Sequence, residues 1–389
     1  MTATTLTKLP ITSPVQIELV ESRAQRERFV RLPWSIYHND PVWTPPLLME
    51  RRKFINPRKH PFYQFGTAVQ YLATLAGRDV GRIMVSNDPH LLRQQPEINA
   101  GFFGLFESID DPAVTAALLD AARVWVRERG RTELWGPIDY STNYACGLLI
   151  DGFDTPPRLT MNHNPAYYEQ LLVGQGMVKL KDLYAWWMER NPEIERWRPR
   201  VEKMAARSRV TLRPLNTKRI RDEVLLCKEI YHQAWQDNWA FVPMTDAEYL
   251  DMAHDIVAYG KPELLLMAEI DGKPIGFSMS MPDVNEALIP LDGRIFNWGL
   301  PLGYLKFLRA LRKVRSARML ILGVLPQFRR RGIAEMLILR TFDVGFNQLG
   351  YTGAELSWTL EDNELINRTI AAVGGKRYKT YRIYQQEIA

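Results

Sequence analysis

Three consecutive arginines followed by a glycine form the segment of this sequence best suited to bind an anion. Arg329, Arg330, Arg331 and Gly332 lie between an apolar run that ends at Val324 and an amphipathic helical pattern. The N-terminus of a helix leaves backbone N–H groups without partners and carries partial positive charge. A glycine lets an anion approach that backbone, and guanidinium groups add charge at the rim. The pattern therefore predicts a binding site for a pyrophosphate.

The order of elements around this loop resembles the acyl-CoA signature of the GNAT acetyltransferase superfamily. A strand at residues 318–324 is followed by Pro326, by the spacing Arg-x-x-Gly-x-Ala and by a helix at 332–349. The resemblance covers residues 210–388. It implies that the cofactor is an acyl-CoA, with acetyl-CoA as the first candidate, and that no metal takes part. It also implies that this strand diverges from the strand at 353–358, that the pantetheine arm lies in the gap, and that a backbone N–H polarises the thioester. The implied donor contacts are Leu322, Gly323, Val324, Arg329, Arg330, Arg331, Gly332, Ile333, Ala334 and Asn363.

One position departs from the family pattern. Asn363 and Gly374 match the family's downstream Asn and Gly, but Ile370 stands where the family has a tyrosine that protonates the leaving thiolate. Because isoleucine has no proton to give, another side chain or water must take that role, or the chemistry is slow or absent. Tyr381, in the terminal strand region, is our candidate acid; a packed strand aromatic is the alternative.

Direct transfer to an amine also needs a group that takes up a proton. Asp283 follows Pro282 where the acceptor site should open, and Glu355 lies on the strand at 353–358. Both are candidate bases, although Pro-Asp-x-Asn is also a good turn sequence. The six histidines show no His-x-x-x-His pairing, and no Ser-His-Asp or Cys-His arrangement can be argued, so we expect neither a metal site nor a covalent intermediate.

The acceptor pocket is expected around the connection between the first two helices of the second half, which lines it in the family. This connection contains Trp235, Trp239 and Phe241, and Asn285 follows the nearby hairpin. Aromatic residues that simply fill the core are the alternative. An insertion at residues 289–318 is apolar first and basic last. It suits a lid over a hydrophobic acceptor or acyl chain, a surface that touches anionic lipid, or packing against the first half.

The elements that must position these residues occur twice in the chain. The second half has a strand, two helices, a hairpin at 263–282, and then the strand, helix, strand, helix and strand described above. The first half repeats this order, with a hairpin at 69–88, a strand at 101–107 and a helix at 112–129. A charged segment at 190–209 indicates a helix between the halves.

We therefore predict an α/β (α+β) fold of two tandem GNAT-like domains. Each is a mixed, mostly antiparallel sheet flanked by helices. The predicted boundaries are residues 1–189 for the first domain, 190–209 for a linker helix and 210–389 for the acyl-CoA-binding domain.

The first half lacks the arginine loop. Glu107, Asp110 and Asp111 stand where a phosphate would arrive, and acids there favour the helix but repel an anion. We expect a degenerate GNAT-like domain that has lost donor binding and that shapes the acceptor pocket. Its long segments at 34–65 and 136–157 either line that pocket or hold the two halves together.

Composition excludes several classes of protein. The chain has 389 residues, a net charge of +6 and 46% hydrophobic residues, which indicates an ordinary globular protein of two or three domains. Two distant cysteines, Cys146 and Cys227, exclude a disulfide scaffold and fit a reducing compartment. No signal peptide or membrane-spanning run is recognised, so the expected location is the cytoplasm.

The function we predict is acyl-CoA-dependent N-acyl transfer, with acetyl moving from acetyl-CoA to a primary amine in a ternary complex. The acceptor would be a small molecule or a peptide, with peripheral contact to a membrane or a hydrophobic acceptor left open. One alternative is transfer of a longer acyl chain. Another is a non-catalytic acyl-CoA-binding module. Nucleic-acid binding is not expected, because no known recognition motif is present.

Overall fold

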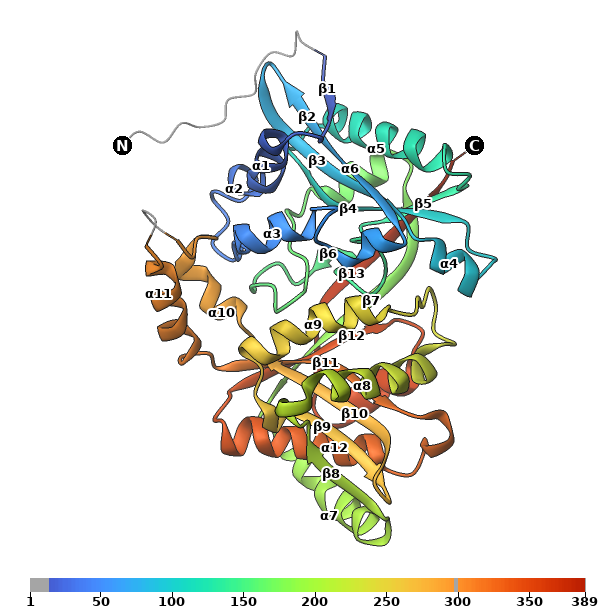
Figure 1. Cartoon of the computed structure of the whole chain (residues 1–389), viewed down its shortest axis with the longest axis vertical. Helices are drawn as coiled ribbons and strands as arrows, with labels where there is room; N and C mark the ends of the chain where they lie inside the picture. The colour runs from blue at the N-terminus through green and yellow to red at the C-terminus, as the bar shows by residue number, and fades with distance from the viewer. Residues whose placement is uncertain (1–13, 297–299, 389) are drawn as a thin grey trace.

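A single 13-stranded sheet runs through both halves of the chain (Figure 1). The computed structural model describes residues 14–296 and 300–388. The strands are β1 (Gln16–Leu19), β2 (Thr67–Leu75), β3 (Arg78–Asn87), β4 (Ala100–Ser108), β5 (Glu133–Gly136), β6 (Leu148–Asp151), β7 (Val178–Glu189), β8 (Val210–Pro214), β9 (Leu265–Ile270), β10 (Lys273–Pro282), β11 (Ser316–Val324), β12 (Gly353–Leu360) and β13 (Lys376–Glu387). Their order is β1-β2-β3-β4-β5-β13-β7-β12-β11-β10-β9-β8, and β6 pairs with β13.

The helices cover both faces of this sheet. They are α1 (Arg23–Arg31), α2 (Pro33–Ile36), α3 (Leu48–Phe54), α4 (Pro89–Gln94), α5 (Pro112–Arg127), α6 (Tyr168–Gly174), α7 (Pro192–Arg207), α8 (Ile220–Trp235), α9 (Asp246–Tyr259), α10 (Asn285–Leu288), α11 (Leu302–Leu311), α12 (Ile333–Phe342) and α13 (Glu364–Ala372). Within the described residues, none of these helices is long and apolar enough to cross a bilayer.

The two halves exchange their last strands. β13, from the C-terminus, pairs with β5 of the first half on one side and with β7 on the other. β7, from the first half, in turn pairs with β12 of the second half. Figure 1 shows the red strand β13 lying among the blue and green strands of the first half. Neither half therefore has a complete sheet of its own, which the order of elements in the sequence did not predict.

Both predicted hairpins are present and turn in the same way. Leu75 pairs with Arg78 and Ile270 with Lys273, so each loop has two residues. Gly77 and Gly272 both have a φ of +75°, as two-residue hairpin turns of this hand require. The loop residues of the first hairpin are Ala76 and Gly77.

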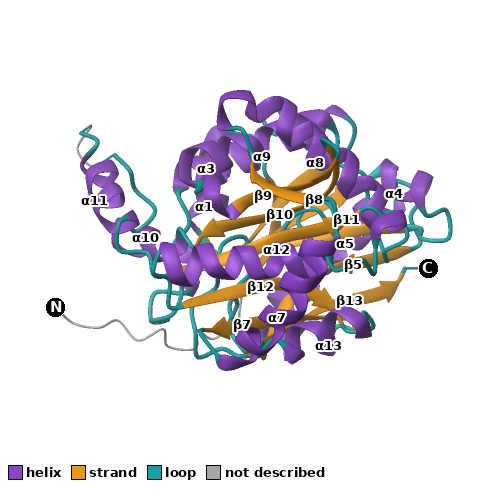
Figure 2. Ribbon diagram, turned by 90° about the horizontal axis from the view of Figure 1, so that it is seen from below, coloured by secondary structure: helices purple, strands orange, loops and turns teal. Residues whose placement is uncertain are grey.

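The two faces of the second half are covered by different helices. On one face, Val224 and Cys227 of α8 and Ile256 of α9 pack on β9 and β10. On the other face, α12 packs on the sheet and α7 packs on α12 (Figure 2). The helix predicted at 190–209 is α7; its residues Ile194 and Val201 are buried, so it is part of the core of the second half.

Candidate functional site

Strands β11 and β12 run parallel for four residue pairs and then separate. The pairing starts at Ser316 with Gly353 and ends at Met319 with Leu356. β11 nevertheless continues to Val324, held on its other side by β10. The β12-facing edge of residues 320–324 therefore has no strand partner. This is the divergence that the resemblance implied.

The side chains around the divergence are unusually accessible for the middle of a sheet. Leu320, Ile321 and Leu322 are partly exposed, and so are residues 357–360 of β12. The preceding residues Ala317 and Glu355 are buried. The open edge and its half-exposed apolar side chains fit the amides and carbon chain of an acyl-pantetheine arm.

The loop after β11 ends in a helix start that carries no side-chain cap. Gly332 is the N-cap of α12 and has a φ of +77°, which favours glycine. Within the described residues, the backbone N–H groups of residues 330–335 donate no hydrogen bond to the protein. These donors, at the positive end of α12, fit the pyrophosphate of a CoA donor.

The three arginines do not have equivalent surroundings, although all are exposed. Arg329 donates a hydrogen bond to the carbonyl of Ala234 at the end of α8, 2.6 Å away. Arg331 lies over the ring of Phe328. Arg330 adopts a left-handed backbone conformation (φ +63°). Arg329 thus ties the loop to α8, and the other two remain the candidates for direct phosphate contact.

The remaining donor contacts implied by the resemblance lie on both sides of the divergence. Leu322, Gly323 and Val324 pair with β10. Asn363 is the N-cap of α13, and its side chain accepts a hydrogen bond from the N–H of Ile366. Ile370 is 9% exposed on the same helix. The donor role of these residues stays a prediction.

A buried ionic group lies directly before the divergence. Arg318 and Glu355 are register neighbours on β11 and β12, and Arg318 Nε lies 2.7 Å from Glu355 Oε1, without the alignment of a hydrogen bond. Glu355 is fully buried and accepts a hydrogen bond from the Tyr378 hydroxyl. Burial and the neighbouring carboxylate raise the pKa of Tyr378, so its phenol stays protonated.

Tyr381 is buried near this group and has an unsatisfied hydroxyl. It is fully buried, and among the described residues its oxygen has no hydrogen-bond partner. Burial, with the charge of Glu355, raises its pKa well above the usual value. A buried hydroxyl without a partner is uncommon and indicates a site for a further polar group.

Asp283 is held in a network that connects the halves. Its carboxylate accepts hydrogen bonds from Arg158 Nη1 at 3.1 Å and from the Leu159 N–H at 2.9 Å. Burial raises its pKa to about 6, and the Arg158 guanidinium opposes that shift. Arg158 also contacts Glu286 and lies over the ring of Trp187.

A strap from the first half, residues 152–161, covers this network. Arg318 donates hydrogen bonds to the carbonyl of Leu159 and to the Thr160 hydroxyl. Lys379 donates to the carbonyls of Gly152 and Thr155. The first half therefore closes one side of the site in the second half. The predicted segment 136–157 contains part of this strap but ends one residue before Arg158.

The predicted acceptor-pocket residues have different environments. Trp235 is partly exposed and lies on Gly323, where an added Cβ would come within 2.4 Å of its ring. Trp239 stacks on Trp135 of the first half with ring centroids 5.5 Å apart. Phe241 is buried. Asn285 donates a hydrogen bond to the carbonyl of Pro157 in the strap.

Sequence reasoning missed the arginines of this site. The sequence pattern places Arg318 only at the start of an apolar strand and gives Arg158 no role. A charge at the start of the run Arg-Met-Leu-Ile-Leu-Gly-Val is the one available signal, since a buried charge requires a partner. Nothing local identifies Arg158, because its partners Asp283 and Glu286 are more than 120 residues away.

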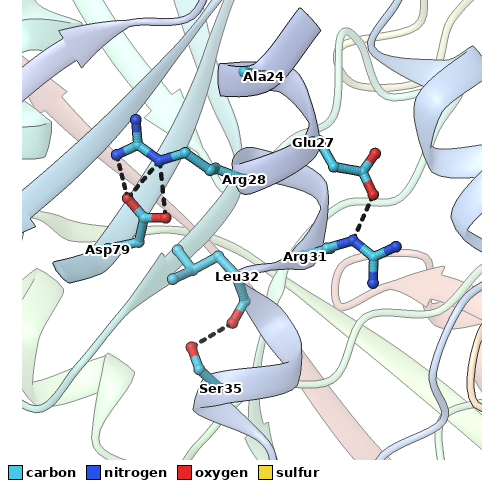
Figure 3. A pocket seen from close by; sticks show the side chains of 7 residues that line it. All are labelled: Ala24, Glu27, Arg28, Arg31, Leu32, Ser35 and Asp79. Atoms are coloured by element: carbon cyan, nitrogen blue, oxygen red, sulfur yellow. Dashed lines mark hydrogen bonds and ion pairs between the residues drawn. The ribbon is translucent and has the colours of Figure 1, made fainter.

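A separate surface hollow lies on the first half, between α1 and β3 (Figure 3). It is lined by Ala24, Glu27, Arg28, Arg31, Leu32, Ser35 and Asp79. Its charged groups satisfy one another, because Arg28 binds Asp79 and Glu18 while Arg31 binds Glu27. The predicted donor residues are not among those that line it.

Comparison with known proteins agrees with this geometry. The profile of the Acetyltransferase (GNAT) family matches residues 225–368. The chain is 38% identical over 377 residues to "Bacterial ceramide synthase" of Caulobacter vibrioides, covering 95% of this chain and 96% of that protein. It is 35% identical over 367 residues to "Protein YghO" of Escherichia coli, covering 92% of each.

Solved structures share the fold at low sequence identity. A tandem GNAT protein from the clavulanic acid biosynthesis pathway superposes with a TM-score of 0.56 at 12% identity, covering 96% of this chain and 99% of that one. A GCN5-related N-acetyltransferase from Sphaerobacter thermophilus gives 0.50 at 14% identity, covering 96% of each chain. The chain therefore belongs to the GNAT acetyltransferase family, in its tandem form, and is an acyltransferase.

Proposed function

We propose that the chain transfers a fatty acyl group from acyl-CoA to the primary amine of a long-chain amino alcohol of the sphingoid type. The carrying observation is the 38% identity, over nearly the whole of both chains, to a protein named ceramide synthase. A ceramide is the amide of a fatty acid and such an amine. The sequence alone favours transfer of an acetyl group, with a longer acyl chain as the alternative. This proposal adopts the longer acyl chain.

The apolar surroundings of the divergence support a long acyl chain. A small cavity lies between α12 and the last pair of β11 and β12, and most of its lining is apolar. It is lined by Met188, Leu264, Ser280, Ala317, Met319, Ile338, Thr341, Phe342, Gly345, Phe346, Tyr351, Gly353, Ala354 and Leu356. We assign the first carbons of the acyl chain to this cavity, because Met319 and Leu356, the last pair before the divergence, line it.

The donor, when bound, supplies the thioester carbon that the amine attacks. In the proposed reaction the amine nitrogen forms the new amide bond, the C–S bond breaks, and coenzyme A leaves as a thiolate. A backbone N–H of the unpaired β11 edge donates a hydrogen bond to the carbonyl oxygen, which gains negative charge. Residues 330–335 hold the pyrophosphate and thereby fix the position of the thioester.

Two proton transfers complete the reaction. We propose that Glu355 takes the proton lost by the amine, through the hydroxyl of Tyr378 that already donates to it. The thiolate gains a proton, and Tyr381 is the proposed donor because its hydroxyl has no other partner. Asp283, the other candidate base, is already engaged by Arg158 and Leu159 and is proposed to hold the strap.

The test is a panel of acyl-CoA donors with a sphingoid base as acceptor, followed by release of free thiol. We expect kcat/KM to rise by more than about tenfold from acetyl-CoA to a long-chain acyl-CoA, since each buried CH₂ contributes about 0.8 kcal/mol. Equal or faster transfer from acetyl-CoA would restore the acetyl alternative. Tight CoA binding without thiol release across amines would favour a binding module.

A loop variant tests the donor site independently. Arg330→Glu with Arg331→Glu should weaken CoA binding by about 10²- to 10⁴-fold, because charge-assisted hydrogen bonds to phosphate contribute about 1.5–3 kcal/mol each and two are lost. The matched control is Lys218→Glu with Arg221→Glu, two exposed cations near the start of α8. Calorimetric titration with CoA measures both. Unchanged binding in the loop variant would contradict this placement of the pyrophosphate.

A further inference from the structure

The insertion at residues 289–318, which contains α11, carries a concentrated apolar surface. Fifteen large apolar side chains are exposed among the described residues, and seven of them lie within residues 289–308. We call these seven the apolar ridge: Ile289, Phe296, Leu300, Leu302, Tyr304, Leu305 and Leu308. Exposures of 39–62% show that the body of the protein does not cover them. A patch of this kind marks an interaction surface.

A second apolar face of α11 packs against the protein and holds the ridge in place. Phe307 is 4% exposed and packs with Leu288, Leu291 and Leu47, the last from the first half. The insertion is further tied to the first half by the hydrogen bond from the Leu48 N–H to the Gly293 carbonyl, 3.0 Å long. The insertion therefore packs against the first half, and the apolar side chains of the ridge stay exposed.

Unpaired cations lie beside the ridge. Arg294, Lys306, Arg309, Arg312, Lys313 and Arg315 are all exposed. None of the six forms an ion pair within the described part of the chain, although many other arginines of this protein do. Six free cations in 22 residues attract an anionic partner. In both views of the molecule this segment lies at the periphery (Figures 1 and 2).

We propose that the ridge docks on the surface of an anionic phospholipid bilayer. Apolar side chains enter the acyl-chain boundary while the neighbouring cations meet lipid phosphates. The charge decides for lipid over a second copy, because two such surfaces face to face would bring six cations against six. Since its evidence is the ridge and its charge, the proposal does not rest on the proposed function.

The experiment is co-sedimentation of the full chain with vesicles of equal phosphatidylglycerol and phosphatidylcholine, or of phosphatidylcholine alone. We expect at least tenfold tighter binding to the anionic vesicles, weakening as salt is raised. Leu305→Glu with Leu308→Glu should weaken that binding at least tenfold. The matched control, Leu365→Glu with Ile366→Glu, changes two exposed apolar residues of α13 and should bind like wild type.

A charge variant and two checks complete the test. Arg309→Glu with Arg312→Glu should lower anionic binding at least tenfold, whereas Lys218→Glu with Arg221→Glu should not. Thermal melting shows that the variants fold. Failure of the wild type to bind anionic vesicles overturns the proposal, and so does wild-type binding by Leu305→Glu/Leu308→Glu. A dimer in light scattering that these ridge variants dissociate would assign the surface to a second copy and also overturn it.

Discussion

The parallel strand pairs β4–β5 and β11–β12 occupy equivalent places in the two halves but differ at the point where they should separate. In the second half the pairing stops at Met319 and Leu356 and the edge of β11 stays open. In the first half the chain after β5 closes the gap, because the Ile138 N–H binds the carbonyl of Phe103 and Asp139 accepts a hydrogen bond from the Leu105 N–H. A Cβ on Gly104 would come within 2.4 Å of Asp139 Oδ1, so the closure is tight.

The helix starts beside these strand pairs differ in the same sense. α12 begins at Gly332 without a side-chain cap, whereas α5 begins at Asp111, whose carboxylate accepts a hydrogen bond from the Ala113 N–H. One helix start thus leaves its donors for a ligand and the other satisfies them internally. That the first half has lost donor binding stays a prediction.

The buried carboxylates show what each half does with the equivalent interior. Glu107 accepts hydrogen bonds from the Tyr37 and Tyr168 hydroxyls and pairs with Arg82, and burial raises its pKa. All of these partners belong to the first half. Glu355 instead lies beneath a strap supplied by the other half. The carboxylate of the first half is therefore enclosed by its own domain, whereas the candidate site of the second half is covered by a strap from the first.

The strongest test of this comparison is to separate the halves. Residues 1–190 and 191–389, expressed alone, should fail to fold, because β13 lies between β5 and β7 and each piece lacks an interior strand. Expressed together, they should form a 1:1 complex that binds CoA. Size-exclusion chromatography with light scattering measures both. Two independently folded, soluble pieces would contradict the exchange of strands.

A second test compares the two buried carboxylates. Glu355→Gln should lower kcat by about 10²- to 10⁴-fold, because glutamine keeps the shape and the hydrogen bond of Tyr378 but cannot take a proton. Glu107→Gln should leave kcat unchanged and lower the free energy of unfolding by about 1–3 kcal/mol. Steady-state kinetics with urea unfolding separates the two effects.

Binding of CoA serves as the control for the second test. Both variants should bind CoA like the wild type, which would show that the donor site is intact. If Glu355→Gln retains full kcat, Glu355 is a structural partner of Arg318, and the two carboxylates then have the same role.

A third and smaller effect concerns pH. His60 packs on Tyr140 in the first-half core, and burial lowers its pKa from 6.5 to about 4. Below pH 6.5 the unfolded chain takes up a proton at His60 that the folded chain excludes. The contribution of neutral His60 to the free energy of unfolding is therefore complete above pH 6.5 and is lost as pH falls towards 4. Between pH 6.5 and 5 the loss should reach about 2 kcal/mol.

The non-titrating variant His60→Phe isolates this contribution. Urea unfolding followed by tryptophan fluorescence should show a shallower loss of stability in the variant than in the wild type over that range. A parallel pH dependence of the two proteins would exclude His60. A single unfolding transition for the whole chain would show that the shared sheet couples the two halves. Two unfolding transitions would show that the first half unfolds separately in acid.

Much of the local structure followed from the sequence. The Asp271-Gly272 turn, the proline start of α5 and the arginine–glycine start of α12 depend on neighbouring residues, whose preferences act within a few positions. The divergence of β11 came from the family resemblance, and the strand register confirms it. The strap, the partly buried Arg158 and the strap contacts of the buried Arg318 depend on residues more than 120 positions apart and leave almost no local signal.

The sequence by itself determined the elements, the arginine–glycine start of α12 and its absence from the first half, because these follow from residue types in short segments. Only the tertiary structure decided that β7 and β13 exchange places, since strand partners are chosen by packing of the whole sheet. It also decided that Arg158 lies at Asp283 and that Arg318 lies at Glu355. A charge that folding removes from water needs a partner. The fold can bring that partner from a distant part of the chain, so the local sequence does not reveal it.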